Sequence, residues 1–236
     1  MPRREPALQR RITAWHEAAH AVVAFRFGIR VDELAICHAG PRAGYVSMLS
    51  TPLVSQGEIW DGGASQLTWA LVQRDTERHA MLRLAGPVAE AKLFGTPMRS
   101  HTCESDLTSA LRLCAMLEEY REHLAATRGL SVAAVTPADL AARLRRRTRQ
   151  VLAYPRTWRA VRALADDLEG WSRLTGHDAA DTVQWTRRID SQLSLLLPVP
   201  AQGGTGHHPR SQRARFRRPL SRSVRSTGVV QTVQVP

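Results

Sequence analysis

Five residues near the N-terminus have the types and the spacing of a metal-binding motif: His16-Glu17-Ala18-Ala19-His20. Two histidines four positions apart lie on one face of a helix, one turn apart. Their neutral imidazoles can fill two positions of a tetrahedral Zn²⁺ site. The glutamate after the first histidine then lies where it can take a proton from an attacking water. The motif therefore predicts that His16 and His20 bind zinc and that Glu17 is a general base.

A simpler interpretation is an ordinary helix that carries two partly exposed histidines and a surface glutamate. The segment from Ile12 to Phe27 is apolar nearly all round, which is typical of a buried helix. Burying two histidines and a glutamate there costs free energy unless they are paired or bound to a metal. The segment therefore favours the metal site over the simpler interpretation.

A catalytic zinc site needs three protein ligands and one open position. The H-x-x-G-x-x-H extension of the metzincins does not follow His20, so that pattern is excluded. The third ligand must therefore come from elsewhere in the chain, and spacing alone leaves the choice open. The side chains with suitable chemistry are Glu90, His101, Cys103, Glu104 and Asp106.

Composition restricts the class of protein. The chain is 43% hydrophobic but only 6% aromatic, and Ala, Leu and Val supply much of the apolar share, which favours a helical fold. Three widely spaced cysteines argue against a disulfide framework and predict a cytoplasmic protein. No apolar stretch reaches about 18 residues, so no membrane span is expected. The sequence contains no G-x-x-x-x-G-K-[ST] phosphate loop, so no ATPase module is expected in it.

The order of the local signals predicts a mainly α fold with a small β-hairpin after the first helix. Strands are expected at 31–37 and 44–49, joined by a loop at 38–43. Gly86-Pro87 should divide one long helical segment into two. Ser105 is a candidate N-cap that would place Asp106 in the first turn of its helix. The expected helical segments are 6–27, 67–94, 106–127, 137–153, 155–174 and 178–197.

The chain divides into a folded domain, residues 1–198, and an Arg/Ser/Gly-rich tail, residues 199–236, that is expected to be disordered. Residues 201–236 hold seven Arg and no acid, so they supply seven of the net charge of +12. Such a tail can contact nucleic acid or an acidic surface. Because Phe216 is its one aromatic residue, a solvated tail without a dedicated partner is the favoured interpretation.

Longer stretches resemble the peptidase domain of the FtsH-type AAA zinc metalloproteases. The segment from Thr13 to Ala24 is similar to the Y-H-E-A-G-H-A-V-V-A run of that family, and residues 36–49 to its hairpin. Residues 84–95 resemble its L-G-G-R-A-A-E-E-L-x-F-G helix, and 105–110 its N-D-L-x-x-A-T segment. Residues 168–176 resemble a late helix and its T-L-x-G turn. The five stretches follow the family's order and cover about residues 10–190.

The resemblance implies a zinc metalloendopeptidase that hydrolyses peptide bonds of proteins or peptides with a metal-activated water. Carried over residue by residue, it implies that His16, His20 and Asp106 bind Zn²⁺ and that Glu17 is the general base. The alternative for Asp106 is a carboxylate that interacts with a helix dipole. Glu90 matches a family acid, and either orients a ligand or forms an ordinary salt bridge.

The sequence also departs from the family. Ala19 replaces its usual Gly, and Pro87 replaces a residue of its Gly-Arg pair. The AAA motor and the membrane anchors are absent, so we do not expect processive degradation of folded proteins from this chain alone. Unfolded chains, peptides or one particular protein are the expected substrates, with or without a separate ATPase. The alternative function is a catalytically inactive binding or regulatory protein that acts through the basic tail.

Overall fold

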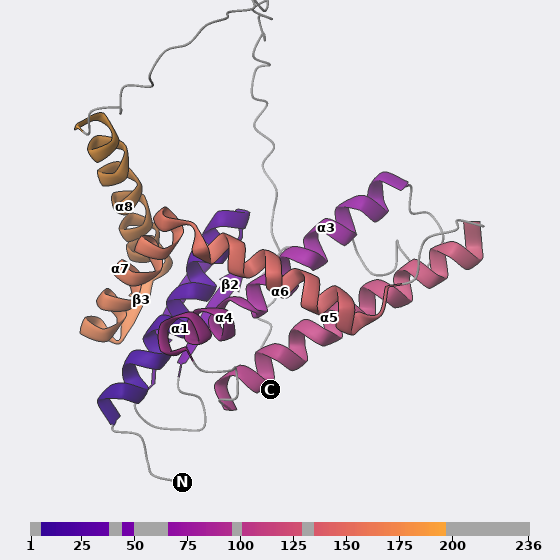
Figure 1. Ribbon diagram of the computed structural model, residues 1–236, viewed down its shortest axis with the longest axis horizontal. Helices are drawn as coiled ribbons and strands as arrows, with labels where there is room; N and C mark the ends of the chain where they lie inside the picture. Colours follow the sequence, from indigo (N-terminus) through magenta and orange to yellow (C-terminus); the bar gives the residue numbers. More distant parts are fainter. Residues whose placement is uncertain (1–5, 38–43, 50–65, 96–100, 129–134, 197–236) are drawn as a thin grey trace, which may run out of the picture.

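The computed structural model describes residues 6–37, 44–49, 66–95, 101–128 and 135–196. Within them the chain is mainly helical, with a small antiparallel sheet that begins directly after the first helix (Figure 1). The predicted fold class is therefore confirmed for this part of the chain. The tail at 199–236 and the hairpin loop at 38–43 lie outside the described residues. No helix in the described ranges is long and apolar enough to cross a membrane.

The described helices are α1 (Pro6–Phe27), α3 (Gln66–Arg83), α4 (Ala85–Phe94), α5 (His101–Arg128), α6 (Pro137–Ala153), α7 (Pro155–Trp171) and α8 (Gly176–Leu196). The described strands are β1 (Arg30–Ile36), β2 (Gly44–Leu49) and β3 (Arg173–Thr175). The strands form one antiparallel sheet in the order β2-β1-β3. Figure 1 shows helices on both sides of α1, with α7 and α8 on one side and α3, α5 and α6 extending away on the other.

Helix α1 forms the centre of the fold, as its apolar sequence predicts. Every residue from Ile12 to Ala24 is buried, and the helix packs against α7, α4 and β1. Ala14, Ala18 and Ala21 are fully buried, and their small side chains let the neighbouring elements approach closely. Gly28 follows the helix with a φ of 74°, a left-handed conformation that favours glycine and ends the helix.

The segment 67–94 is divided into two helices, as predicted, but not at the predicted residues. The break is at Leu84, and Gly86 and Pro87 lie in the first turn of α4. A proline is tolerated there because the first N–H groups of a helix have no partner within it. The division of the segment leaves α3 and α4 as separate supports for the face of α1 that carries the histidines.

Helix α5 begins at His101, five residues earlier than predicted, so Ser105 is not its N-cap and Asp106 lies in its second turn. The extra turn follows from burial. Cys103, Asp106 and Ala110 are all buried on one helical face, which places the first turn of α5 against the core. The interpretation of Asp106 as a carboxylate in a first helical turn is therefore wrong.

The chain between α7 and α8 was predicted incorrectly. Helix α7 ends at Trp171 instead of continuing to Leu174, because Ser172 takes a left-handed conformation with a φ of 65°. Residues 173–175 then pair with β1 as a third strand. Helix α8 begins at Gly176, where the side chains and backbone N–H groups of Thr175 and Asp178 exchange hydrogen bonds as a capping box.

We predict that Gly176→Ala destabilises the fold strongly. A Cβ at this position would lie 1.8 Å from the carbonyl oxygen of Val31, so β1 or α8 must move, at a cost of about 1–3 kcal/mol or more. The matched control is Gly170→Ala in α7, where a Cβ meets nothing within 4 Å. That control should be stabilising by about 0.5–1 kcal/mol. Urea unfolding of both variants measures the difference, and equal midpoints would contradict the packing of α8 on β1.

Candidate metal centre

Three potential ligand atoms converge between α1 and α5. The Oδ2 atom of Asp106 lies 2.8 Å from Nε2 of His16 and 3.1 Å from Nε2 of His20. The two Nε2 atoms are 3.0 Å apart. All three residues are buried. The two histidines and Asp106 therefore form a compact triangle, and they constitute a group that could hold a metal ion.

The outer nitrogen of each imidazole has a hydrogen-bond acceptor. Nδ1 of His16 lies 2.7 Å from Oε1 of Glu90, and Nδ1 of His20 lies 2.7 Å from the carbonyl oxygen of Leu82. A carbonyl oxygen only accepts, so Nδ1 of His20 carries the proton, and the carboxylate of Glu90 favours the same tautomer at His16. In the neutral rings both Nε2 atoms then present lone pairs toward Asp106, which is the tautomer that metal ligation requires.

The centre of the triangle attracts positive charge. Two lone pairs and a carboxylate oxygen face one another in a buried space, so they repel unless a proton or a metal cation lies between them. Burial alone would lower the pKa of His16, but its hydrogen bonds to Asp106, Cys103 and Glu90 and the charge of Glu17 raise it well above its ordinary value. The same acceptors that hold a proton on His16 would favour a divalent cation.

The pKa of the Asp106 carboxyl is lowered despite its burial. Burial alone would raise its pKa, but the charges of His20 and His16 and their hydrogen bonds hold it far below its usual value. The guanidinium of Arg83 lies 3.8 Å from Oδ1, the carboxylate oxygen on the other side from the histidines. These contacts favour the charged carboxylate form of Asp106 beside the histidine pair.

Glu17 is another buried polar residue of the region, with 8% of its surface exposed. Burial raises its pKa above the ordinary value for a glutamate, although the charges of His16 and His20 oppose this. Gly44, the first residue of β2, lies directly against it, since a Cβ there would be 2.8 Å from Oε1 of Glu17. The Glu17 carboxyl is thus more basic than usual and lies beside the start of a strand.

Gly86 allows the His16 ring to occupy its position. A Cβ on Gly86 would lie 2.4 Å from Nε2 and 2.5 Å from Cε1 of His16. Only a glycine leaves room for the imidazole at this point of α4. The sequence predicted that Gly86-Pro87 breaks a helix, but it did not predict that Gly86 makes room for His16.

The donor set fits a zinc ion. Zinc takes imidazole nitrogens and carboxylate oxygens at about 2.0–2.2 Å in tetrahedral geometry, which places neighbouring ligand atoms about 3–4 Å apart. The separations of 2.8–3.1 Å within the triangle are close to this range. Three protein ligands leave the fourth position for a water or a substrate atom, as catalytic zinc sites require.

The structure distinguishes among the five candidates for the third ligand by their positions relative to His16 and His20. Asp106 joins the histidine pair, whereas Glu90 and Cys103 group with His16 alone. Glu104 is exposed, although it lies only two residues from Asp106. The side chain of His101 lies outside the described residues. Glu90 contacts Nδ1 of His16, and this contact fits both roles left open for it, because it is a hydrogen bond that would orient a ligand and also an ion pair when His16 is protonated.

Three contributions to the centre were missed from the sequence. The carbonyl of Leu82 holds His20, the guanidinium of Arg83 faces Asp106, and Gly86 makes room for His16. The contact of the Leu82 carbonyl could not be predicted, because every residue has a backbone carbonyl and the sequence does not show which one lies near His20. The Gly86-Pro87 pair was noticed, but its contact with α1 depends on the packing of α4.

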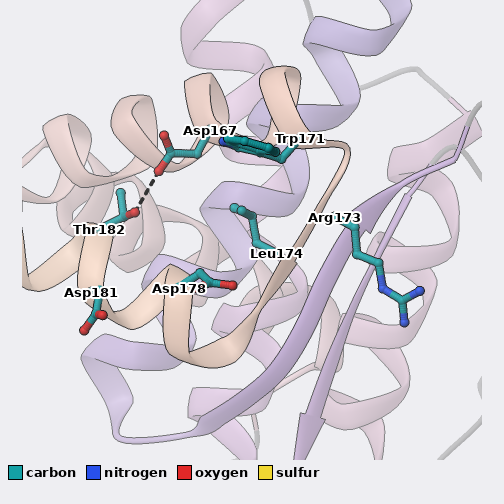
Figure 2. A pocket seen from close by; sticks show the side chains of 7 residues that line it. All are labelled: Asp167, Trp171, Arg173, Leu174, Asp178, Asp181 and Thr182. Carbon is teal, nitrogen blue, oxygen red and sulfur yellow. Dashed lines mark hydrogen bonds between the residues drawn. The ribbon is translucent and has the colours of Figure 1, made fainter.

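A hollow between α7 and α8 lies apart from the metal centre (Figure 2). Leu174 lies within it, Trp171 lies over one side, and Asp167 accepts a hydrogen bond of 2.7 Å from Thr182. None of the residues that line it belongs to the histidine and aspartate triangle. The chemistry of the metal centre therefore does not depend on this hollow.

No protein-family model matches this chain, and neither does any curated protein.

We predict that Gly86→Ala weakens Zn²⁺ binding. The new methyl group must displace the His16 ring, and disturbing the support of a ligand typically costs about 10–100-fold in metal affinity. Because the ring can move at modest cost to the fold, unfolding in the absence of zinc should change less than metal binding does. Titration of the variant with Zn²⁺ measures the effect, with Gly170→Ala as the control that keeps wild-type affinity. Wild-type affinity in Gly86→Ala would contradict this placement of His16.

Proposed function

We propose that this protein is a zinc-dependent metalloendopeptidase that hydrolyses peptide bonds in unfolded proteins or peptides. The observation that supports the proposal most is the convergence of His16, His20 and Asp106 on one point, with Glu17 buried next to the first histidine. These are the residues that the H-E-x-x-H motif and its resemblance to FtsH-type peptidases implied.

His16, His20 and Asp106 would hold the metal. The chemistry that a zinc ion supplies when bound is Lewis acidity, which polarises the scissile carbonyl and lowers the pKa of water. Glu17 would accept the proton of the attacking water at its carboxylate and later deliver it to the nitrogen of the leaving amine. Its raised pKa suits both steps, because a base with a pKa nearer to neutrality also serves as an acid.

The substrate class is inferred from the position of β2. Among the described strands β2 lies at the edge of the sheet, and its Gly44 contacts Glu17. An extended polypeptide can pair with the free edge of a strand through its main chain. A peptide paired with β2 would pass next to Glu17, so an unfolded segment is the form of substrate that this arrangement accepts.

The cellular setting is part of the proposal. The cysteines Cys37, Cys103 and Cys114 form no disulfide, which agrees with a reducing cytoplasm. A separate ATPase could supply unfolded chains, and the basic tail could contact an acidic surface. A catalytically inactive binding protein remains the rival function, but such a protein has no need for a buried Glu17 beside the histidines, where burial is costly.

We expect Glu17→Gln to abolish peptidase activity while zinc binding persists. The amide keeps the size of the side chain but accepts no proton, so the rate should fall by about 10²–10⁴-fold or more. Casein digestion and elemental zinc analysis of the same preparation test both parts. Asp106→Asn is the companion variant, which should lose zinc as well as activity.

Two results would count against the proposal. Undiminished digestion by Glu17→Gln would remove Glu17 from the mechanism. A wild-type protein that holds zinc but digests no unfolded substrate would favour the rival function.

A further inference from the structure

The ring of His16 belongs to a second group of potential metal ligands. His16, Glu90 and Cys103 form a group whose ligand atoms are all within 4.8 Å of one another. Nδ1 of His16, the nitrogen that does not face Asp106, lies 2.7 Å from Oε1 of Glu90. All three residues are buried, and Cys103 is completely so.

Two helices place these groups around one imidazole. Cys103 and Asp106 are three residues apart on α5, so the same helical face presents a thiol and a carboxylate, one turn apart, to His16. Glu90 comes from α4, four residues after the glycine that contacts the ring. His16 is therefore shared by two groups of potential ligands, with Asp106 and His20 in one and Glu90 and Cys103 in the other.

The presence of Glu90 is explained by its role in orienting the His16 ring, but this role does not explain the presence of Cys103. One carboxylate is enough to fix the tautomer and the orientation of a metal-binding histidine. A thiol within ligand distance of that carboxylate adds a soft donor, and thiolate, imidazole and carboxylate together are a donor set that suits zinc and cobalt. The burial of all three groups would keep competing water away from such an ion.

We propose that Glu90, Cys103 and Nδ1 of His16 form a second metal site, for a divalent cation that accepts thiolate ligands. The site goes beyond the proposed peptidase centre but shares His16 with it. Binding would release the proton of the Cys103 thiol and that of Nδ1 to solvent, and no electron is transferred. With both sites filled, the His16 imidazolate bridges the two ions through its two nitrogens.

Titration of the full chain with Co²⁺ under reducing conditions tests the second site. Co²⁺ bound to a thiolate shows a charge-transfer absorption in the near ultraviolet that nitrogen and oxygen ligands do not give. A Cys37→Ser background removes the exposed thiol. In this background we expect two equivalents of tightly bound Co²⁺ and the thiolate absorption.

Single variants then assign the two sites. Cys103→Ser should bind one equivalent and lose the thiolate absorption. Cys114→Ser is the matched control: it changes another fully buried cysteine of α5 that packs in an apolar cluster, and both equivalents and the absorption should remain. His20→Ala should lose the first equivalent and keep the absorption, because His20 belongs to the triangle alone.

Each contrary result has a definite meaning. One equivalent without thiolate absorption in the Cys37→Ser background would overturn the second site and leave the peptidase proposal standing. Absorption that persists in Cys103→Ser would overturn the assignment of the ligand. Failure to bind any Co²⁺ or Zn²⁺ would overturn both proposals. The first measurement needs no change in the buried site, so the test holds even where Cys103→Ser folds poorly.

Discussion

The mutual repulsion of three buried acceptors is the constraint on which the centre of this structure depends. Nε2 of His16, Nε2 of His20 and Oδ2 of Asp106 lie within 3.1 Å of one another. In a buried site such an arrangement persists only with a proton or a metal cation between the acceptors. The surrounding contacts keep the rings in place: Glu90 and Leu82 hold the outer nitrogens, and Gly86 makes room for one ring. The packing of α1 against its neighbours and the convergence of the three acceptors thus depend on the same contacts.

The position of the centre in the fold explains how this arrangement is held. Two hydrophobic clusters meet near it, one around α1, α4 and α7 and one among α3, α5 and α6. Polar ligands lie where these clusters adjoin, so apolar packing on both sides fixes their backbones. Side chains supported in this way are held closely in position, as a metal site requires.

The sequence predicted the parts that follow from local patterns and missed those that follow from packing. The buried helix, the hairpin strands and the helix expected at 137–153 are all found, because apolar periodicity and capping chemistry, here the Thr136 cap of α6, act locally. Spacing could not choose Asp106 among five candidates; only the family resemblance did. The first turn of α5 and strand β3 were missed because each is stabilised by partners distant in sequence, such as β1 for Arg173.

The separation of these partners along the chain also bears on when the centre can form. The contacts of His16 with Glu90 and Asp106 span 74 and 90 residues, and α7, which covers another face of α1, begins only at Pro155. Contacts of such long range form late, since loop closure must precede them. During synthesis the histidine pair therefore leaves the ribosome long before its carboxylate does. A nascent chain therefore cannot complete this centre until most of the domain has been made, and any chemistry of the centre has to wait for that stage.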